Sequence, residues 1–341
     1  IGSNAAQTPF SELASVLTNL DLSAGRLSPE QAAQVRESFR SLAARGDAAV
    51  PLIKTLLDQK VDVKYGKGSG DTVGVPSLRA GLLETLRQIG SPDAIALSRQ
   101  VLENSSDPME IALLARNLEG VAPGQYRQDL MNVTLASLNA AAQDQKDASD
   151  VSPLFQTLQA FGDTNVVGTL TSMASKYGYY ADLALAGLPA GQGVSALTQM
   201  AQDSSASGAG NRQFALQMLA QVAAQYPEAT SALVELARQN QVPQSAWGAI
   251  AAVLAGQQFQ FPRSYPENMF ATVNGPDLRT HYQAIGNQTF LSMMAPAEAS
   301  AQTLNQRLNL LEQLSAATTD PAALQALQAA RAKLTASPGP K

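Results

Sequence analysis

Capped joints between short amphipathic stretches are the feature that most restricts the fold of this chain. Ser28-Pro29-Glu30-Gln31 combines a capping serine, a proline in the first turn and a glutamine three residues after the serine. Gly90-Ser91-Pro92-Asp93 ends one helix with glycine and starts the next with serine and proline. Similar joints occur at Gly46-Asp47, Ser106-Asp107-Pro108, Gly162-Asp163, Tyr226-Pro227-Glu228 and Asp320-Pro321. Together they predict a succession of helix–turn–helix units.

The residues between these joints favour helix over strand. About one residue in six is alanine, leucine and glutamine are common, and aromatic residues make up only 5% of the chain. Apolar residues recur at intervals of three and four, as in Leu82, Leu83, Leu86 and Ile89. The expected fold class is therefore all-α.

The joints also recur along the chain. Gly46 and Gly90 are 44 residues apart, and Gly90 and Gly162 are 72 apart, which is two steps of 36. Helix-pair repeats have periods of about 34 to 47 residues. A single pair of this length does not enclose its own apolar face, so neighbouring pairs stack to build a core.

Three stretches resemble parts of HEAT repeats. Residues 46–57 read like the inner helix of a HEAT unit, residues 86–95 like its inter-helix turn, and residues 107–117 like the opening helix of the next unit. The resemblance extends over about residues 28–120, weakens to residue 255 and then ends. It implies an α/α superhelix, a HEAT/armadillo-like solenoid of about five or six helix pairs.

We expect five parts along the chain. They are an N-terminal segment with a capping helix (1–27), the HEAT-like repeats (28–255), a non-repeat segment rich in aromatic, proline and glycine residues (256–296), a C-terminal helical hairpin that caps the last repeat (297–336) and a disordered tail (337–341). Residues 60–75, with the Gly66-Lys67-Gly68-Ser69-Gly70 run, form a flexible loop that lengthens the first repeat.

Composition removes many kinds of chemistry. The chain has no cysteine, which excludes disulfides, thiol nucleophiles and thiolate metal sites, and its one histidine, His281, excludes two-histidine metal sites. The net charge of −5 argues against nucleic acid as a partner. No apolar run reaches the roughly 20 residues of a membrane-spanning helix. We expect no metal or cofactor.

The short motifs favour structural interpretations. The glycine run lacks the spacing of a phosphate-binding loop. Lys54, Lys60, Lys64 and Lys67 are interspersed with aspartates, and Asp144, Asp147 and Asp150 lack the spacing and glycine of a calcium loop. His281 has no serine-nucleophile motif to act on, which favours a structural role.

Clustered aromatic residues are the best candidates for a binding site. Tyr177, Tyr179 and Tyr180 lie together beside Gly178, and Trp247 opens a second group that continues to Tyr282. Tyrosine and tryptophan dominate binding hot spots, but the same residues also build cores. The pattern favours core for the Trp247 group and leaves the tyrosines open between the two roles.

The resulting hypothesis is a non-catalytic scaffold that binds a protein or peptide through its inner helices. Two alternatives stay open. One is a glycan-active enzyme with two carboxylates about 5 to 10 Å apart, and the other is a structural subunit of a larger envelope assembly. Sparse lysine, absent cysteine and abundant alanine, glutamine and serine suggest an exported bacterial protein, periplasmic or secreted, and we expect a signal peptide to have preceded Ile1.

Overall fold

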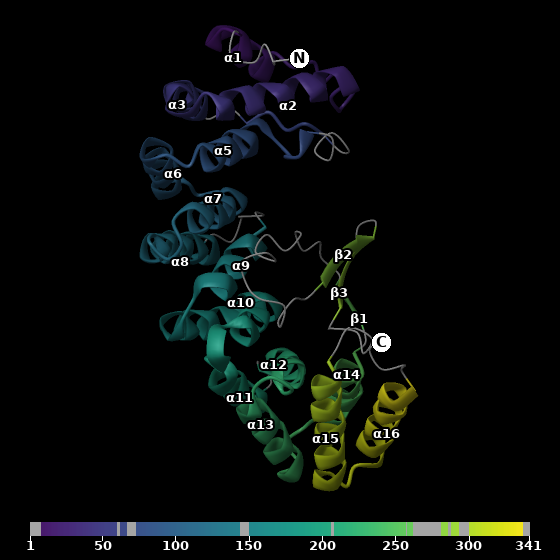
Figure 1. Ribbon diagram of the computed structural model, residues 1–341. Helices are drawn as coiled ribbons and strands as arrows, with labels where there is room; N and C mark the ends of the chain where they lie inside the picture. Colours follow the sequence, from purple (N-terminus) through teal and green to yellow (C-terminus); the bar gives the residue numbers. More distant parts are fainter. Residues whose placement is uncertain are drawn as a thin grey trace. The chain divides into compact units, whose positions relative to one another are not determined.

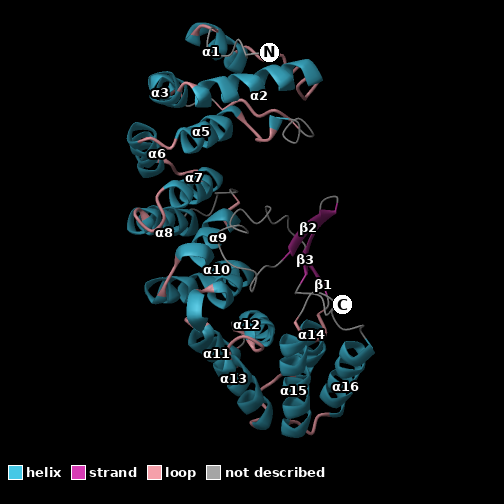
Figure 2. Ribbon diagram, in the orientation of Figure 1, coloured by secondary structure: helices cyan, strands magenta, loops and turns pink. Residues whose placement is uncertain are grey.

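The protein is described by a computed structural model, which covers nine stretches of the chain. The described residues are 8–59, 62–66, 73–143, 150–205, 208–256, 258–261, 281–285, 288–292 and 300–336. Only the backbone is described for the three short strands at 258–261, 281–285 and 288–292, and for Tyr179 and Ala209. The described part is helical apart from these strands, which confirms the helical class predicted from composition and periodicity (Figure 2). The tail at 337–341 lies outside the described residues.

The chain divides into two compact units, Ile1–Ser137 and Leu138–Lys341. This boundary, which falls within α8, has no counterpart in the five parts expected from the sequence. The helices of unit 1 are α1 (Phe10–Thr18), α2 (Pro29–Ala44), α3 (Val50–Asp58), α5 (Leu78–Ile89), α6 (Pro92–Asn104), α7 (Pro108–Val121) and the first part of α8 (Arg127–Gln143).

Several helix ends in unit 1 lie at the joints predicted from the sequence. Ser28 and Gln31 form the reciprocal hydrogen bonds of a capping box at the start of α2. Gly90 ends α5 in the left-handed conformation, and Ser91 caps α6. The Gly46-Asp47 joint differs, because Gly46–Ala49 forms a 3₁₀ turn and α3 begins at Val50 with no side-chain cap.

In unit 1, alternate helices pack on one another. α2 packs against α5, and α5 packs against α7, while α3 contacts α6 (Figure 1). α2 and α5 approach closely at Gly81, where a Cβ atom would lie 2.1 Å from Cζ of Phe39. The core between the helices is formed by leucines such as Leu42, Leu82 and Leu114, which have no exposed surface.

The connection between α3 and α5 is packed where it is described. Tyr65 is fully buried, and its backbone N–H donates to the carbonyl of Pro76, while Leu78 N–H donates to the carbonyl of Val63. Gly66 has a positive φ, and a Cβ there would lie 2.1 Å from the carbonyl oxygen of Gly25. The flank of the expected flexible loop is therefore fixed, and residues 67–72 lie outside the described residues.

Unit 2 is built from helices and a small sheet. Its helices are α9 (Ser152–Phe161), α10 (Thr164–Gly187), α11 (Val194–Gln202), α12 (Ala209–Val222), α13 (Pro227–Arg238), α14 (Gln244–Leu254), α15 (Ala301–Ala317) and α16 (Pro321–Ala336). α10 packs against α9, α11 and α12. The predicted C-terminal hairpin is α15 and α16, which pack on α13 and α14.

The non-repeat segment contains strands, which the sequence did not predict. β1 (Gln258–Phe261), β2 (His281–Ile285) and β3 (Gln288–Ser292) form an antiparallel sheet in the order β1-β3-β2. Phe259 and Tyr282 are both paired with Leu291 in the register of this sheet. Aromatic and glutamine residues alternate along β1, which is a two-residue period within a chain dominated by helical periods.

Candidate functional site

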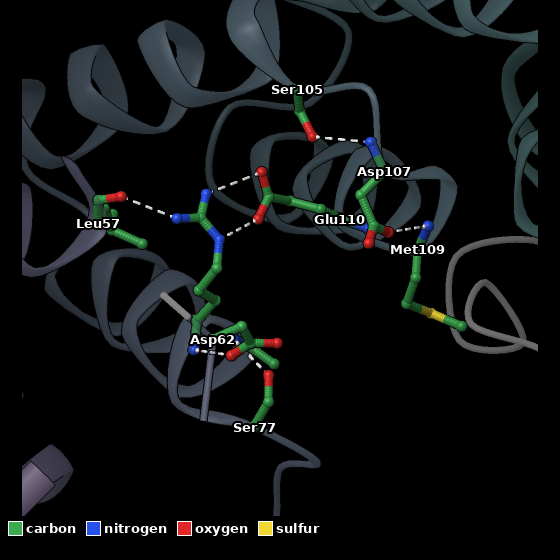
Figure 3. Close-up of polar contacts among 9 residues, drawn as sticks. Leu57, Asp62, Ser77, Ser105, Asp107, Met109 and Glu110 are labelled. Carbon is green, nitrogen blue, oxygen red and sulfur yellow. Dashed lines mark hydrogen bonds and ion pairs between the residues drawn. The ribbon is translucent and has the colours of Figure 1, made fainter. Parts of the chain in front are cut away.

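Arg79, the second residue of α5, joins three segments of unit 1. Its guanidinium donates to both carboxylate oxygens of Glu110 on α7, at 2.7 and 3.0 Å, and to the carbonyl of Leu57 at the end of α3, at 2.8 Å (Figure 3). Its backbone N–H donates to Oδ1 of Asp62 at 3.0 Å. The hydrogen bonds to Glu110 raise the pKa of the Arg79 guanidinium above its usual value. This paired, two-point contact fixes α5 relative to α7.

The start of α7 places Glu110 where Arg79 reaches it. Asp107 caps the helix, and its Oδ1 accepts hydrogen bonds from the backbone N–H groups of Met109 and Glu110, at 2.8 and 3.0 Å (Figure 3). Pro108 occupies the first turn, as the sequence predicted. An acidic residue in this turn also lies favourably near the positive end of the helix dipole.

Further polar contacts join successive helix pairs in unit 1. Arg116 on α7 reaches Glu84 on α5 at 3.3 Å, and Arg99 on α6 reaches Asp129 on α8 at 2.8 Å. The side-chain amide of the buried Asn117 donates to the carbonyl of Leu83 at 3.2 Å. The partners of these contacts lie 30 to 34 residues apart in the sequence. The spacing matches the step of 30 residues between the starts of α5 and α7.

A few part-exposed charged side chains on α5 and α7 are held by ion pairs. Glu84 lies between Arg87 on its own helix, at 2.5 Å, and Arg116 on the neighbouring helix. The side chains of Arg87 and Arg116 are 40% and 35% exposed, so both arginines are paired with Glu84 and still partly accessible. Met109, on the same helix as Arg116, is 41% exposed. We refer to Glu84, Arg87, Met109 and Arg116 as the α5–α7 face.

The candidate tyrosines in unit 2 lie at a kink in α10. Tyr177 has non-helical backbone angles, φ −122° and ψ 23°, and its hydroxyl donates to the carbonyl of Ala141 at 3.2 Å. The ammonium of Lys176 donates to the carbonyls of Ala141 and Ala142 at 3.1 and 2.7 Å. The two side chains therefore satisfy carbonyls at the end of α8 that have no partner within the helix.

The other aromatic candidates are mostly enclosed. Tyr180 is buried and stacks on the buried Phe155, whose ring also meets Tyr177 edge-on, with centroids 5.8 and 5.7 Å apart. Trp247 on α14 is 2% exposed, which is the buried position that the sequence favoured for its group. The side chain of Tyr179 lies outside the described residues. Tyr177 and Tyr180 are thus brought together with Phe155 as packing and capping groups.

Asp182 is an acidic group that the sequence reasoning passed over. It lies on α10 between the buried residues Ala181 and Leu183, has no exposed surface, and neither carboxylate oxygen has a hydrogen-bond partner among the described residues. Burial raises the pKa of this carboxyl to about 8. The sequence does contain a signal for this buried acid, because Asp182 is the one charged residue within the apolar run of residues 180–186.

The remaining sequence candidates do not form a described site. Lys54 pairs with Asp58 on the surface of α3, and Lys64 is exposed. Lys60, Lys67, Asp144 and Asp147, and the side chain of His281, lie outside the described residues. Within the described part of the chain, no three histidine, cysteine or acidic residues gather as a metal site.

No protein-family model matches the chain, and no curated protein matches it. Among the helices that the structure describes, none is long and apolar enough to span a membrane.

The arginine and carboxylate residues of unit 1 were not predicted from the sequence, because each partner lies in a different short stretch of the chain. Comparing opposite charges about 30 residues apart reveals Arg79 with Glu110 and Glu84 with Arg116.

Proposed function

We propose that this protein is a non-catalytic scaffold of the HEAT/armadillo-like solenoid type, and that it binds a protein or peptide at the α5–α7 face. The observation that carries the proposal is the pair of half-exposed arginines, Arg87 and Arg116, held on neighbouring helices by the same carboxylate. Preorganised guanidinium groups lose little conformational entropy on binding, and arginine is enriched in binding hot spots.

The α5–α7 face is more accessible to a partner than the aromatic candidates of unit 2 are. Trp247 and Tyr180 are buried, and the hydroxyl of Tyr177 is already hydrogen-bonded to α8. The α5–α7 face instead combines exposed charge with the exposed thioether of Met109, a flexible side chain that adapts to different partners. We infer that the partner presents an acidic group beside an apolar one. An extracytoplasmic location remains part of the proposal, on compositional grounds.

The glycan-active alternative receives no support from Asp182. Glycoside hydrolysis needs two carboxylates facing each other across a cleft that admits substrate. Asp182 is fully enclosed, so no substrate reaches it, and neither of its carboxylate oxygens has a hydrogen-bond partner among the described residues. It is therefore not a member of such a pair in this conformation.

Site-specific photo-crosslinking tests the proposal. A photoreactive amino acid replaces Met109 on α7. In a matched control it replaces Glu103 on α6, whose side chain is also exposed. Both proteins are incubated with the envelope fraction of the source cells and irradiated. We expect a discrete protein adduct at position 109 that is lost on adding Arg87→Glu, because this change reverses charge at the face without altering the buried residues. Equal adducts at both positions, or none at position 109, would contradict the proposal.

A further inference from the structure

The part of α10 that follows the kink is enclosed on all sides. Residues 180 to 186 are all buried, and apart from Asp182 they are apolar or aromatic. A helix that is buried all round normally carries no ionisable residue, because an unpaired charge there is very costly. We refer to residues 178–187 as the α10 core segment.

The helices packed against α10 do not supply a counter-ion. The residues of α9 and α11 include no charged side chain. α12 contributes Arg212, whose guanidinium donates to the carbonyls of Ala201 and Gln241. On α10 itself, Lys176 lies before the kink and donates to the end of α8. Within the described residues, the ionised form of Asp182 therefore has neither a cation nor a hydrogen-bond donor to stabilise it.

The α10 core segment is helical and lies between the kink at Tyr177 and the end of the helix at Leu188. Tyr177 departs from helical backbone angles at its start, and Leu188 adopts extended angles at its end, φ −62° and ψ 142°. Gly178 lies directly against α12, where a Cβ would be 2.6 Å from Oδ1 of Asn211. The kink and the helix end allow the segment to move as a unit while the first part of α10 stays in place.

We propose that Asp182 makes the packing of the α10 core segment dependent on pH. The segment is closed while the acid is neutral, and ionisation drives it to open about Tyr177 and Gly178 so that the carboxylate reaches water. The proposal concerns unit 2 and is independent of binding at the α5–α7 face.

The sign of the effect follows from the burial. The pKa of Asp182 is about 8 in the folded chain against 3.8 for a free aspartate, so the folded state holds the proton more strongly. The stabilising contribution of this proton is fully present below pH 3.8 and is lost as the pH rises toward 8. The equilibrium between open and closed segment then shifts by up to about tenfold per pH unit in this interval.

Hydrogen exchange of the full chain tests the proposal. Exchange of the amides in residues 178–187 is measured between pH 5 and pH 8.5, corrected for intrinsic rates, in the wild type, Asp182→Asn and the control Asp163→Asn. Asp163 caps α10 from an exposed position, and asparagine also caps, so this control keeps the helix start. We expect the opening equilibrium of the wild type and of the control to rise more than tenfold over this range, and that of Asp182→Asn to stay flat.

Equal pH dependence in the wild type and Asp182→Asn would overturn the proposal. Carbon-13 NMR of the Asp182 carboxyl in the wild type gives a second measurement that does not depend on the variant folding. A titration midpoint near 8 supports the proposal, and a midpoint below 5 overturns it, because the carboxylate would then be ionised inside the closed segment.

Discussion

The two units treat charge in opposite ways. Unit 1 has 28 charged residues in 137, and its partly buried carboxylates Glu110 and Glu119 each face an arginine, Arg79 and Arg127. Unit 2 has 23 charged residues in 204, and its buried carboxylate, Asp182, has no hydrogen-bond partner among the described residues. Buried carboxylates therefore connect helices through ion pairs in unit 1, whereas the buried carboxylate of unit 2 is expected to destabilise the packing when it is ionised.

The difference teaches what sets the spacing of helices in each unit. In unit 1, ion pairs between arginine and glutamate side chains connect α5 to α7, so each contact depends on both partners being present. In unit 2, the rings of Phe155, Tyr177 and Tyr180 and the apolar residues of α10 occupy the space between helices. Four tests sharpen this comparison, beginning with the one of largest expected effect.

Removing the buried ring of Phe155 tests whether unit 2 depends on aromatic packing. Phe155→Ala is expected to lower the free energy of unfolding by about 3 to 5 kcal/mol, because it leaves a cavity beside Tyr177 and Tyr180. Hydrogen exchange is measured by peptide in α9, α10, α2 and α5, with Phe155→Leu as the milder control. Loss of protection confined to α9 and α10 keeps the units separate, whereas equal loss in α2 and α5 would show that they unfold as one.

Changing a carboxylate to an amide tests the opposite roles of charge directly. At pH 8, Glu110→Gln is expected to destabilise the chain by about 1 to 3 kcal/mol, because Arg79, with a side chain only 20% exposed, loses its anionic partner. At the same pH, Asp182→Asn is expected to stabilise the chain by a similar amount, about 1 to 3 kcal/mol, because the fully buried position 182 then carries no charge.

Urea unfolding at pH 8 measures both effects of this pair. Glu37→Gln is the control, since the pair that Glu37 forms with Arg40 is exposed and is expected to contribute less than about 0.5 kcal/mol. The comparison between the units fails if Glu110→Gln and Asp182→Asn change the stability in the same direction.

Gly81→Ala tests the close approach of α2 and α5. The added methyl group would lie 2.1 Å from Cζ of Phe39, so the two helices must separate, and we expect a loss of about 1 to 2 kcal/mol. Gly120→Ala on α7 is the matched control, because nothing lies within 4 Å of its Cβ position and alanine favours helix. Adding Phe39→Leu should recover part of the loss; a double variant no better than Gly81→Ala would assign the loss to another cause.

Helix starts were the part of the fold that could be predicted best. Ser28, Ser91, Asp107 and Asp163 act as caps in the structure, because the capping hydrogen bond is local and depends on one residue and its next two or three neighbours. The strands of residues 258–292 were missed, since each is only four or five residues long, and β1 pairs with a strand that is distant in the sequence, so the local pattern is weak.

The candidate site could be predicted only in part. Clustering identified Tyr177 and Tyr180 as neighbours, but the periodicity around them does not distinguish a ring in the core from a ring on the surface. Gly178 beside the tyrosines indicated a helix end, and the structure has a kink at Tyr177, after which the helix continues. The contact between Arg79 and Glu110 was missed because it depends on the stacking of helices, which sets a separation of 31 residues that no local rule contains.

Tyr177→Phe tests whether the hydroxyl of this tyrosine serves the end of α8. The ring and its contact with Phe155 remain, so the variant removes the hydrogen bond to the carbonyl of Ala141 and little else. We expect a loss of about 0.5 to 1.5 kcal/mol in urea unfolding, toward the lower value because Lys176 also donates to Ala141. Tyr126→Phe is the control, since its ring lies against Arg99 and its hydroxyl has no partner among the described residues. Equal stability of Tyr177→Phe and wild type, together with weakened capture of a partner, would return Tyr177 to the binding role that its clustering first suggested.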